Sequence, residues 1–364
     1  MKKIISIVGA RPNFIKIAPL AKAFKKYRKE VKHLLCHTGQ HFDPLMSEVF
    51  FEDLKIPRPD FSLGISGGSH AEQTARIMLA LEKVLATERP DLVIVPGDVN
   101  STMAGALVAS KMSIPIAHVE AGLRSFDKTM PEEINRIVTD VVSDFLFVSE
   151  HSGTHNLRDE GVDDNKIFFV GNTMIDTLEA NYDTLESCPV TDELGLTKEN
   201  YIVATFHRPG NVDDPEALNE LLNTLRNLAR ERKVVFPVHP RTRKNIETFG
   251  LEEKVPDNLL MIEPVGYISF LSLLRYAELV ITDSGGIQEE TTYMNVQCIT
   301  VRKNTERPVT IDVGTNHLVG TGMEKVEKAA LDILGGTTKP GRIPELWDGK
   351  AARRIAQIIM EHKT

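Results

Sequence analysis

An apolar run near residue 280 ends in Asp-Ser-Gly-Gly, residues 283–286. The run predicts a buried strand, and the residues that follow predict an amphipathic helix beginning near Ile287. A strand, a glycine turn and a helix in this order direct backbone N–H groups and the positive end of the helix dipole toward one point. Such a point suits a phosphate, for which the Ser284 hydroxyl is a further donor. The alternative is a capped turn that binds no ligand.

Polar side chains follow several predicted strands in the second half of the chain. His207 and His239 come directly after apolar runs, and Arg307 lies in the polar segment that follows a third such run. Glu289 and Glu290 are expected in the first turn of the helix that follows the glycines, where they could accept hydrogen bonds from sugar hydroxyls. A lone histidine is more often a surface or core residue than a catalyst. Two histidines at corresponding strand ends, beside the expected phosphate turn, favour a functional role.

The first half carries charged residues at equivalent places. Arg11 and Lys16 follow the first predicted strand, Asp98 follows the third and Glu120 follows the fourth. In open α/β sheets, ligands bind outside the carboxyl ends of the strands. Two cations at this edge predict an anionic ligand, although a solvated basic helix start is the alternative.

Glu132, near the start of a predicted helix, is a third carboxylate of this half. Together with Asp98 and Glu120 it predicts proton-transfer chemistry on a bound anion. Crowded carboxylates raise one another's pKa, which gives an acid or base that works near neutral pH. The alternative is structural, with Glu120 paired to Arg124, and Glu132 paired to Arg136, as salt bridges.

The elements that must position these residues alternate strand and helix in both halves of the chain. The pattern covers residues 1 to about 170 and starts again at Tyr201, after a polar, aperiodic stretch. A last predicted helix follows a Gly/Pro-rich link long enough to return to the first domain. The 364 residues therefore predict an α/β protein with two doubly wound, Rossmann-like domains. We expect residues 1–175 and 349–364 in the first domain, and 176–348 in the second.

Composition excludes several classes of function. The net charge of −8 argues against a nucleic-acid partner. The three cysteines are scattered without paired spacing, which suits a reducing cytoplasm and gives no zinc site. No run reaches the roughly 18 apolar residues of a membrane span, and the apolar run at the N-terminus is too short for a signal peptide. We therefore expect a cytoplasmic enzyme or binding protein.

These residues lie within longer motifs that resemble one family. In chain order the motifs are GARPNFIKIAPL, TGQH, PGDVNST, HVEAGLRS, MPEEINR, FHRPGNVD, HPRTRK, DSGGIQEE and TERP…GTNHLVG. They run from Gly9 to Gly320 and are similar to those of the non-hydrolysing UDP-N-acetylglucosamine 2-epimerases. The resemblance implies the glycosyltransferase-B fold with the active site in the interdomain cleft, a homodimer, and UDP-GlcNAc and UDP-ManNAc as substrates. It implies no NAD, no metal ion and no other cofactor.

The resemblance also implies roles for individual residues. Phe270 would lie at the uracil, and Asp98, Glu120 and Glu132 would move protons or stabilise the oxocarbenium-like state. His207 joins this catalytic set, because it would act on the departing diphosphate, and His239 joins the substrate-binding set. The groups that would hold UDP are Arg11, Lys16, His207, Ser284, Gly285, Gly286, Glu290 and Arg307.

The family reaction eliminates UDP across C1–C2 to give 2-acetamidoglucal and then adds UDP back after reprotonation on the other face. This chain differs from the family pattern at three places. Residues 209–210 are Pro-Gly and residue 309 is Val, where glutamate is common, and residues 42–44 differ from the pattern tied to an allosteric UDP-GlcNAc site in bacterial members. The first two leave open a 2-epimerase of a UDP-2,3-diacetamido uronic acid. A UDP-sugar glycosyltransferase is a more distant alternative.

Overall fold

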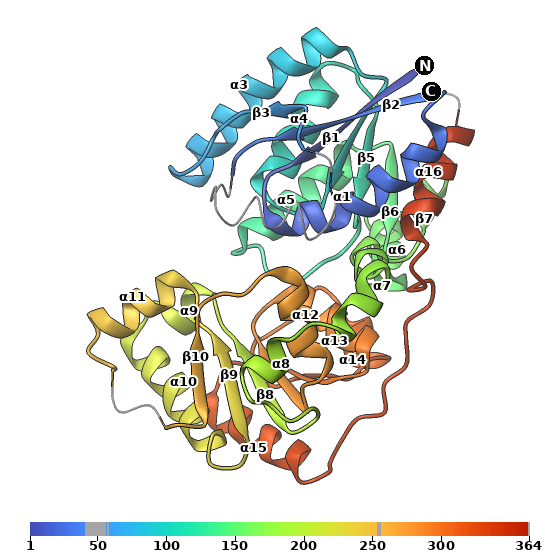
Figure 1. The fold of residues 1–364 in the computed structure, drawn as a ribbon. Coiled ribbons are helices and arrows are strands. Elements are labelled where there is room, and N and C mark those ends of the chain that lie inside the picture. The colour runs from blue at the N-terminus through green and yellow to red at the C-terminus, as the bar shows by residue number, and fades with distance from the viewer. Residues whose placement is uncertain (41–55, 57, 253–255, 363–364) are drawn as a thin grey trace. The chain divides into compact units, whose positions relative to one another are not determined.

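The structure is a computed structural model that describes residues 1–40, 56, 58–252 and 256–362. It divides into two compact units (Figure 1). Unit 1 comprises Met1–Ala180 and Glu345–Thr364, and unit 2 comprises Asn181–Pro344. The boundaries expected from the sequence, at residues 175 and 348, lie a few residues away from these. Residues 42–44, which bear on the allosteric site, lie outside the described residues.

Unit 1 contains, within its described residues, a parallel sheet in the order β3-β2-β1-β4-β5-β6-β7. Strand β1 is mostly apolar after its two lysines, and its residues from Ile4 to Val8 are buried, as expected where both faces of a sheet are covered. The strands are β1 (Lys2–Val8), β2 (Val31–His37), β3 (Phe61–Ser62), β4 (Leu92–Pro96), β5 (Ile116–Val119), β6 (Phe145–Val148) and β7 (Ile167–Phe169).

Helices cover both faces of this sheet (Figure 1). Helices α3, α4 and α5 lie on one face, and α1 and α16 pack together on the other. Ser69 and Glu72 form a capping box that starts α3. The helices are α1 (Arg11–Phe24), η1 (Lys25–Tyr27), α3 (His70–Glu88), α4 (Asn100–Lys111), α5 (Pro131–Val142), α6 (His151–Asp159), η2 (Asp164–Lys166), α7 (Thr173–Glu186) and α16 (Ala351–Glu361).

Specific hydrogen bonds attach the last segment of the chain to unit 1. The indole Nε1 of the buried Trp347 donates to the carbonyl oxygen of Ser149 at 2.9 Å. The Asp176 carboxylate accepts from the N–H groups of Ala351 and Ala352, at 3.0 and 2.7 Å, and so caps the start of α16. The chain therefore passes through unit 2 and then returns to unit 1, where its last segment packs.

Unit 2 repeats the same strand order as β10-β9-β8-β11-β12-β13 within its described residues. The predicted α/β class with two doubly wound sheets is confirmed. The strands are β8 (Tyr201–Thr205), β9 (Lys233–Pro237), β10 (Leu259–Ile262), β11 (Leu279–Thr282), β12 (Gln297–Thr300) and β13 (Asn316–Leu318). The helices are α8 (Val190–Glu193), α9 (Pro209–Val212), α10 (Pro215–Leu228), α11 (Pro240–Thr248), α12 (Tyr267–Arg275), α13 (Gly285–Met294), α14 (Val309–Asp312) and α15 (Met323–Leu334).

Each sheet has one point where the strand order reverses. The reversal lies between β1 and β4 in unit 1 and between β8 and β11 in unit 2. Because the flanking connections leave in opposite directions, the carboxyl ends of the strands at such a point form a crevice that ligands use. The candidate residues of each unit are therefore expected to lie at this edge.

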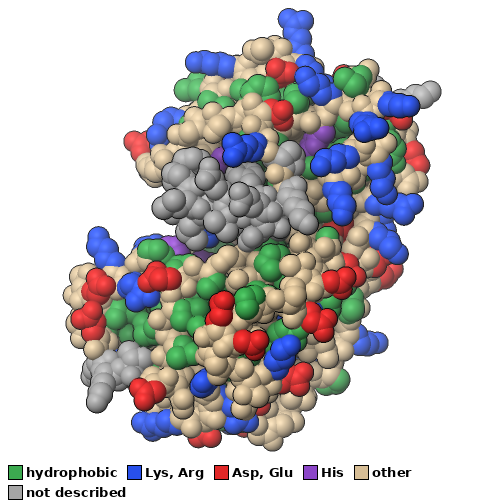
Figure 2. Space-filling view, viewed as in Figure 1, with side chains coloured by type: hydrophobic (Ala, Val, Ile, Leu, Met, Phe, Trp, Pro, Cys, Tyr) green, Lys and Arg blue, Asp and Glu red, His purple; other side chains and the backbone are tan. Residues whose placement is uncertain are grey.

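Both units expose acidic and basic side chains on the face shown in Figure 2. This mixture accords with the modest net charge of −8. None of the helices in the described residues combines the length and apolar character that crossing a membrane requires.

Candidate active site

Lys16 and Glu120 form a buried ion pair at the carboxyl edge of the unit 1 sheet. Lys16 lies on α1, which follows β1, and Glu120 is the first residue after β5. Their side chains are 4% and 5% exposed, so water screens the attraction little. The alternative pairing of Glu120 with Arg124 is wrong, because Arg124 binds Asp140 and Glu160 instead, each at 2.7 Å.

The backbone of Glu120 is also unusual. Its φ of +74° lies in the left-handed region, which costs a non-glycine residue on the order of 1–3 kcal/mol. The N–H groups of Glu120 and Ala121 both donate to the carbonyl oxygen of Phe147 at 3.0 Å and hold this turn in place. Backbone strain of this kind is concentrated at functional sites, so both conformation and burial single out Glu120.

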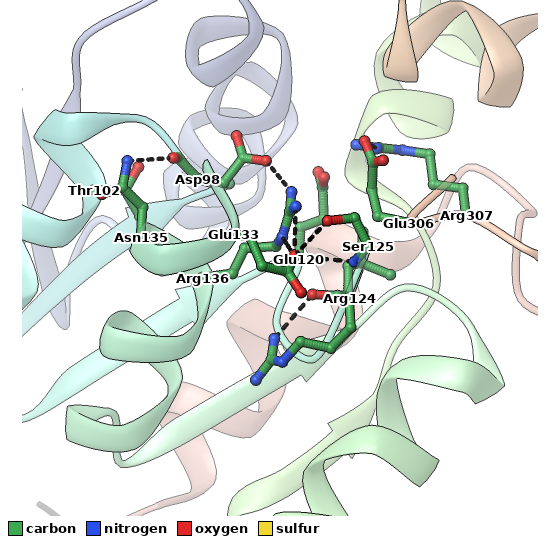
Figure 3. Close-up of polar contacts among 12 residues, drawn as sticks. Asp98, Thr102, Glu120, Arg124, Ser125, Glu133, Asn135, Arg136, Glu306 and Arg307 are labelled. Carbon is green, nitrogen blue, oxygen red and sulfur yellow. Dashed lines mark hydrogen bonds and ion pairs between the residues drawn. The ribbon is translucent and has the colours of Figure 1, made fainter. Parts of the chain in front are cut away.

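Asp98 follows β4 and lies beside Arg136 of α5 (Figure 3). The buried Arg136 guanidinium binds the Asp98 carboxylate and also donates from Nη2 to Glu133 at 2.8 Å. The carbonyl oxygen of Asp98 accepts from Asn135 Nδ2 at 2.8 Å. Helix α5 thus holds both the backbone and the side chain of Asp98, of which 22% remains exposed.

Glu132 and Glu133 are adjacent on α5 but have different surroundings. Glu133 is buried and accepts from the N–H groups of Ser125 and Phe126 at 2.9 and 2.8 Å (Figure 3). Glu133 therefore stabilises the loop after β5. Glu132 is half-buried, and its carboxylate pairs with no other described residue. The alternative pairing of Glu132 with Arg136 is wrong, and its carboxylate stays available to a ligand.

Two buried residues that sequence reasoning did not single out connect these loops. His118 lies on β5, and its Nδ1 is 2.6 Å from Oδ1 of Asp140 on α5. Its Nε2 donates to the carbonyl oxygen of Gly97 at 2.8 Å. The sequence held a signal for this network, because a histidine inside a buried apolar strand must find polar partners.

Arg11 completes the set of unit 1. It is the first residue of α1 and is exposed. The Asn13 side chain accepts from the N–H groups of Gly9 and Ala10 at 2.9 and 3.0 Å, which stabilises the turn between β1 and α1. The structure thus brings all the unit 1 candidates to the carboxyl ends of β1, β4 and β5 and the start of α5, namely Arg11, Lys16, Asp98, Glu120 and Glu132.

In unit 2, α13 begins at Gly285, two residues earlier than expected, because both glycines adopt helical geometry after the N-cap residue Ser284. The prediction that Glu289 and Glu290 lie in the first turn is therefore wrong, since both lie further along the helix and are buried. A Cβ on Gly285 would lie 2.7 Å from Nη1 of Arg307, so any larger residue here would displace the Arg307 guanidinium. The start of α13 keeps the geometry of an anion site.

Arg307 follows β12 and is buried among carboxylates. It binds Glu306 through Nη1, as Figure 3 shows, and its Nε lies 3.0 Å from Oε1 of Glu289. Arg302 binds the same Glu306 through Nη2 at 2.7 Å. These pairs orient the Arg307 guanidinium beside the first residue of α13.

Glu290 is a buried carboxyl whose pKa is raised. Burial raises its pKa to about 8, and the neighbouring Glu289 adds to this effect, while the bond from the Tyr267 hydroxyl at 3.2 Å opposes it. Glu290 is therefore mainly protonated at neutral pH. A protonated carboxyl both donates and accepts hydrogen bonds, which suits contact with sugar hydroxyls.

His207 follows β8 and is oriented by Asp283. Its Nδ1 lies 2.8 Å from Oδ1 of Asp283, and the ring is 53% exposed whereas the carboxylate is fully buried. Asp283 also accepts from the N–H of Arg208 and from Asn211 Nδ2, each at 2.9 Å. Burial opposes ionisation of Asp283, but the bonds from His207, Arg208 and Asn211 outweigh it and lower its pKa. Sequence reasoning missed Asp283 as the residue that orients this histidine.

The remaining candidates of unit 2 lie nearby in the sheet order. His239 follows β9 and is exposed, with its Nδ1 accepting from the N–H of Arg241 at 3.2 Å. Phe270 is half-buried on α12. The segments that follow the adjacent strands β9, β8, β11 and β12 therefore carry His239, His207, Ser284 and Arg307. Within the residues that the structure describes, no group of three or more His, Cys, Asp or Glu side chains could hold a metal ion.

Comparison with known proteins gives a consistent result. The family model for UDP-N-acetylglucosamine 2-epimerase matches residues 23–360. A UDP-N-acetylglucosamine 2-epimerase of Methanococcus maripaludis is 45% identical and is covered over 100% of both chains. The crystal structure of the Methanocaldococcus jannaschii UDP-GlcNAc 2-epimerase in complex with UDP-GlcNAc and UDP is 42% identical, with 99% of this chain and 100% of that chain covered and a TM-score of 0.92.

A relative with a different substrate in its name is also similar. The UDP-2,3-diacetamido-2,3-dideoxy-D-glucuronate 2-epimerase of Pseudomonas aeruginosa is 42% identical over 98% of this chain and 99% of its own. A spinosyn rhamnosyltransferase, 12% identical with a TM-score of 0.52 over 99% and 96% of the two chains, shares the fold alone. The predicted glycosyltransferase-B fold is confirmed. The match to the family model and to full-length relatives shows that this chain belongs to the UDP-N-acetylglucosamine 2-epimerase family, a family of isomerases.

Proposed function

We propose that the protein interconverts UDP-GlcNAc and UDP-ManNAc by eliminating UDP and adding it back. Two relatives that are 42% and 45% identical over nearly their whole length are UDP-GlcNAc 2-epimerases by name. The observation that carries the mechanism is Glu120, a buried carboxylate in a strained turn beside Lys16. Because β5 pairs with β4, the same sheet edge also presents Asp98.

Elimination makes the chemistry at C2 feasible. The C2 hydrogen is not acidic, because no neighbouring carbonyl carbon of the ring stabilises a carbanion. When the C1–O bond breaks, UDP leaves with the electron pair and C1 becomes oxocarbenium-like. A carboxylate then removes the C2 proton, and the electrons of the C–H bond form the C1=C2 double bond of 2-acetamidoglucal. Protonation of C2 on the opposite face, with return of UDP to C1, completes the epimerisation.

We assign proton transfer to the carboxylates of unit 1. Removal and delivery occur on opposite faces of C2, so one carboxylate cannot perform both steps in a single turnover. Lys16 holds Glu120, and Arg136 holds Asp98, at separate positions on the sheet edge. Glu132 pairs with no other described residue and is the third group that could exchange a proton with the sugar.

We assign UDP to the groups of unit 2, and we assign an anionic ligand to the cations Arg11 and Lys16 of unit 1. The start of α13, with Gly285 and Gly286, would contact the diphosphate through backbone N–H groups. Donors aimed at charge that develops on a leaving group supply much of a reduction in activation barrier. In this assignment His207, Ser284 and Arg307 contact the diphosphate. Glu290 contacts the ribose, Phe270 lies at the uracil and His239 lies at the edge of the UDP site.

A second substrate class is supported by two observations. The relative from Pseudomonas aeruginosa, named for a UDP-diacetamido-glucuronate, is 42% identical, as is the structural relative named for UDP-GlcNAc. Helix α9, which follows His207, begins with Pro209 and Gly210, where glutamate is common in the family. Turnover of both UDP-sugars by the purified protein decides between them. A kcat/KM for the uronate well above that for UDP-GlcNAc would replace our proposal.

We also propose that the protein forms a homodimer and works in the cytoplasm. Leu79 of α3 and Val141 of α5 are 65% and 72% exposed, and both helices pack on α4. Exposed apolar side chains on one face fit a contact with a second copy of the chain. The three cysteines form no disulfide, as expected in a reducing compartment. Light scattering during gel filtration tests the dimer, and a monomer at micromolar concentration would contradict it.

The elimination route has a direct test in the reverse half-reaction. Purified protein is incubated with UDP and synthetic 2-acetamidoglucal, and the products are separated by chromatography. The route predicts that UDP-sugars form, and that Glu120→Gln forms far less of them. Conversion of UDP-GlcNAc by a protein that cannot consume the glucal would contradict the route while leaving the epimerase activity intact.

A further inference from the structure

We propose that His118 is a positioning residue for the two carboxylates Asp98 and Glu120. It acts through Gly97 and Asp140, which its two ring nitrogens join. This inference rests on the proposed function, in which those carboxylates exchange protons with C2 of the sugar. It concerns how unit 1 holds the carboxylates and assigns no contact of His118 with the substrate.

The His118 ring is completely buried between two loops and a helix of unit 1. Nε2 is 2.8 Å from the carbonyl oxygen of Gly97, and Nδ1 is 2.6 Å from Oδ1 of Asp140. Asp140 in turn accepts from the N–H of Gly122 at 3.1 Å and binds Nη1 of Arg124 at 2.7 Å. The imidazole therefore links the turn after β4 to the turn after β5.

Both ring nitrogens of His118 donate hydrogen bonds. A carbonyl oxygen can only accept, so Nε2 carries a proton. Burial opposes ionisation of Asp140, but His118 and Arg124 outweigh it and lower the pKa of that carboxyl. The Asp140 carboxylate already accepts from the N–H of Gly122 and from Arg124, so it acts as an acceptor here, and the histidine nitrogen that faces it carries a proton as well. The geometry thus places a proton on each ring nitrogen, within a buried network that also contains Asp140, Arg124 and Glu160.

The network ends close to the two carboxylates. Gly97 directly precedes Asp98, and Gly122 follows Glu120 by two residues. The N–H of Gly97 also donates to the carbonyl oxygen of Val119 at 2.9 Å. Strand β5 therefore binds Gly97 at both its N–H and its carbonyl oxygen, which leaves the peptide before Asp98 little freedom to rotate.

Neither turn has space in which to absorb a displacement. Gly97 and Gly122 have φ values of +65° and +78°. A Cβ on Gly97 would lie 2.9 Å from Nζ of Lys16, and one on Gly122 would lie 2.4 Å from the carbonyl oxygen of Gly153. If the bonds from His118 were lost, the tightly packed turns could not absorb the change. The attached carboxylates Asp98 and Glu120 would therefore shift.

The test substitutes glutamine for this histidine. A glutamine amide can donate to one partner, but its carbonyl oxygen cannot donate to the other. His33→Gln is the matched control, because His33 lies in the same sheet, opposite Ile4 in the amino half of β1, and bonds only to Ser6 Oγ, at 2.8 Å, among the hydrogen bonds found in the described residues. Burial lowers the pKa of His33 to about 4, so that ring is neutral.

We expect His118→Gln to lower kcat roughly 100-fold, the effect of a displacement of about 1 Å at a reacting group. KM and the Kd for UDP should change less than about threefold, because the proposed UDP groups belong mainly to unit 2. The control should retain kcat within about twofold of wild type. Wild-type kcat in His118→Gln would overturn the proposal. A parallel loss of kcat, UDP affinity and Tm would show a merely structural role and overturn it too.

Nitrogen NMR of the wild-type protein gives a test that needs no folded variant. With labelled histidine, His118 should show both ring nitrogens protonated and a strongly deshielded proton shared with Asp140. A single protonated nitrogen would overturn the proposal. If the wild-type protein epimerises no UDP-sugar, the proposed function fails, and the positioning role fails with it even when both protons are seen. The two failures are therefore distinguishable.

Discussion

Replacing Glu290 by glutamine should change how the stability of unit 2 depends on pH. Burial raises the pKa of this carboxyl to about 8 in the folded protein, whereas in an unfolded chain a glutamate titrates near ~4.3. Between these two values the unfolded chain has lost the proton and the folded protein retains it. Each pH unit in this window therefore costs the wild-type protein about 1.4 kcal/mol of unfolding free energy.

The unfolding free energy should fall as pH rises, because the pKa of Glu290 is raised on folding. A raised pKa stabilises the folded protein fully below the unfolded value, and this stabilisation is lost as pH rises through the folded value. Glutamine cannot ionise, so the unfolding free energy of the variant does not fall in this way as pH rises. Between about pH 5.5 and pH 7.5, wild type should lose about 3 kcal/mol relative to Glu290→Gln. The difference should level off above the folded pKa.

Urea unfolding followed by circular dichroism at several pH values measures this difference. Glu231→Gln, at an exposed glutamate of the same unit, is the control and should show no such pH dependence. Tyr267→Phe should move the window to higher pH, because the Tyr267 hydroxyl lowers the pKa of Glu290. A difference between wild type and Glu290→Gln that stays constant from pH 5 to pH 9 would mean that Glu290 is ionised in the fold, and the reasoning would fail.

Glu120→Gln should lower kcat by about 10²- to 10⁴-fold, the usual contribution of a proton-transfer group, while calorimetry finds UDP binding unchanged; lost UDP affinity with normal turnover at saturation would show that the role is misassigned. Asp283→Asn should destabilise unit 2 by about 2 kcal/mol and weaken UDP binding, since an amide cannot accept from every donor that Asp283 serves; an unchanged Tm and Kd would count against it. Gly285→Ala should displace Arg307 and weaken UDP binding at least about tenfold, whereas Gly322→Ala, which meets nothing within 4 Å, should not; equal affinities in the two variants would refute the crowding argument.

Much of the candidate site followed from the ends of the predicted strands. Buried strands of a parallel sheet read as continuous apolar runs, so the ends of β4 and β5 were visible, and with them Asp98 and Glu120. The same reasoning located His207 after β8 and Arg307 after β12. Strand ends can be located in a sequence because apolar residues give way to polar ones where burial stops.

The partners of these residues could not be read in the same way. Sequence spacing favours pairs that are close in the chain, such as Glu132 with Arg136, which are i and i+4 neighbours on a helix, or Glu120 with Arg124 in one loop. The actual partner, Lys16, follows β1, which β4 separates from β5 in the sheet. Pairing across the sheet depends on strand order, which a single sequence does not state.

The buried positioning groups were also beyond local reasoning. The sequence predicts that Asp283 belongs to a phosphate turn, yet its carboxylate faces inward and binds His207 and the N–H of Arg208. The environment of Glu290 depends on the residue at which α13 begins. The ends of a helix are the part that sequence patterns predict least well. A start at Gly285 carries Glu290 past the first turn into the interior.

Proton NMR of the purified protein with UDP-GlcNAc in D2O tests the central claim most directly. Our account predicts that UDP-ManNAc appears with deuterium at C2, and that deuterium also enters C2 of the remaining UDP-GlcNAc, because the proton on C2 is exchanged through Asp98, Glu120 or Glu132 while UDP is detached. A new epimer that keeps its original hydrogen would contradict the elimination route, and the absence of both conversion and exchange would contradict the proposed activity.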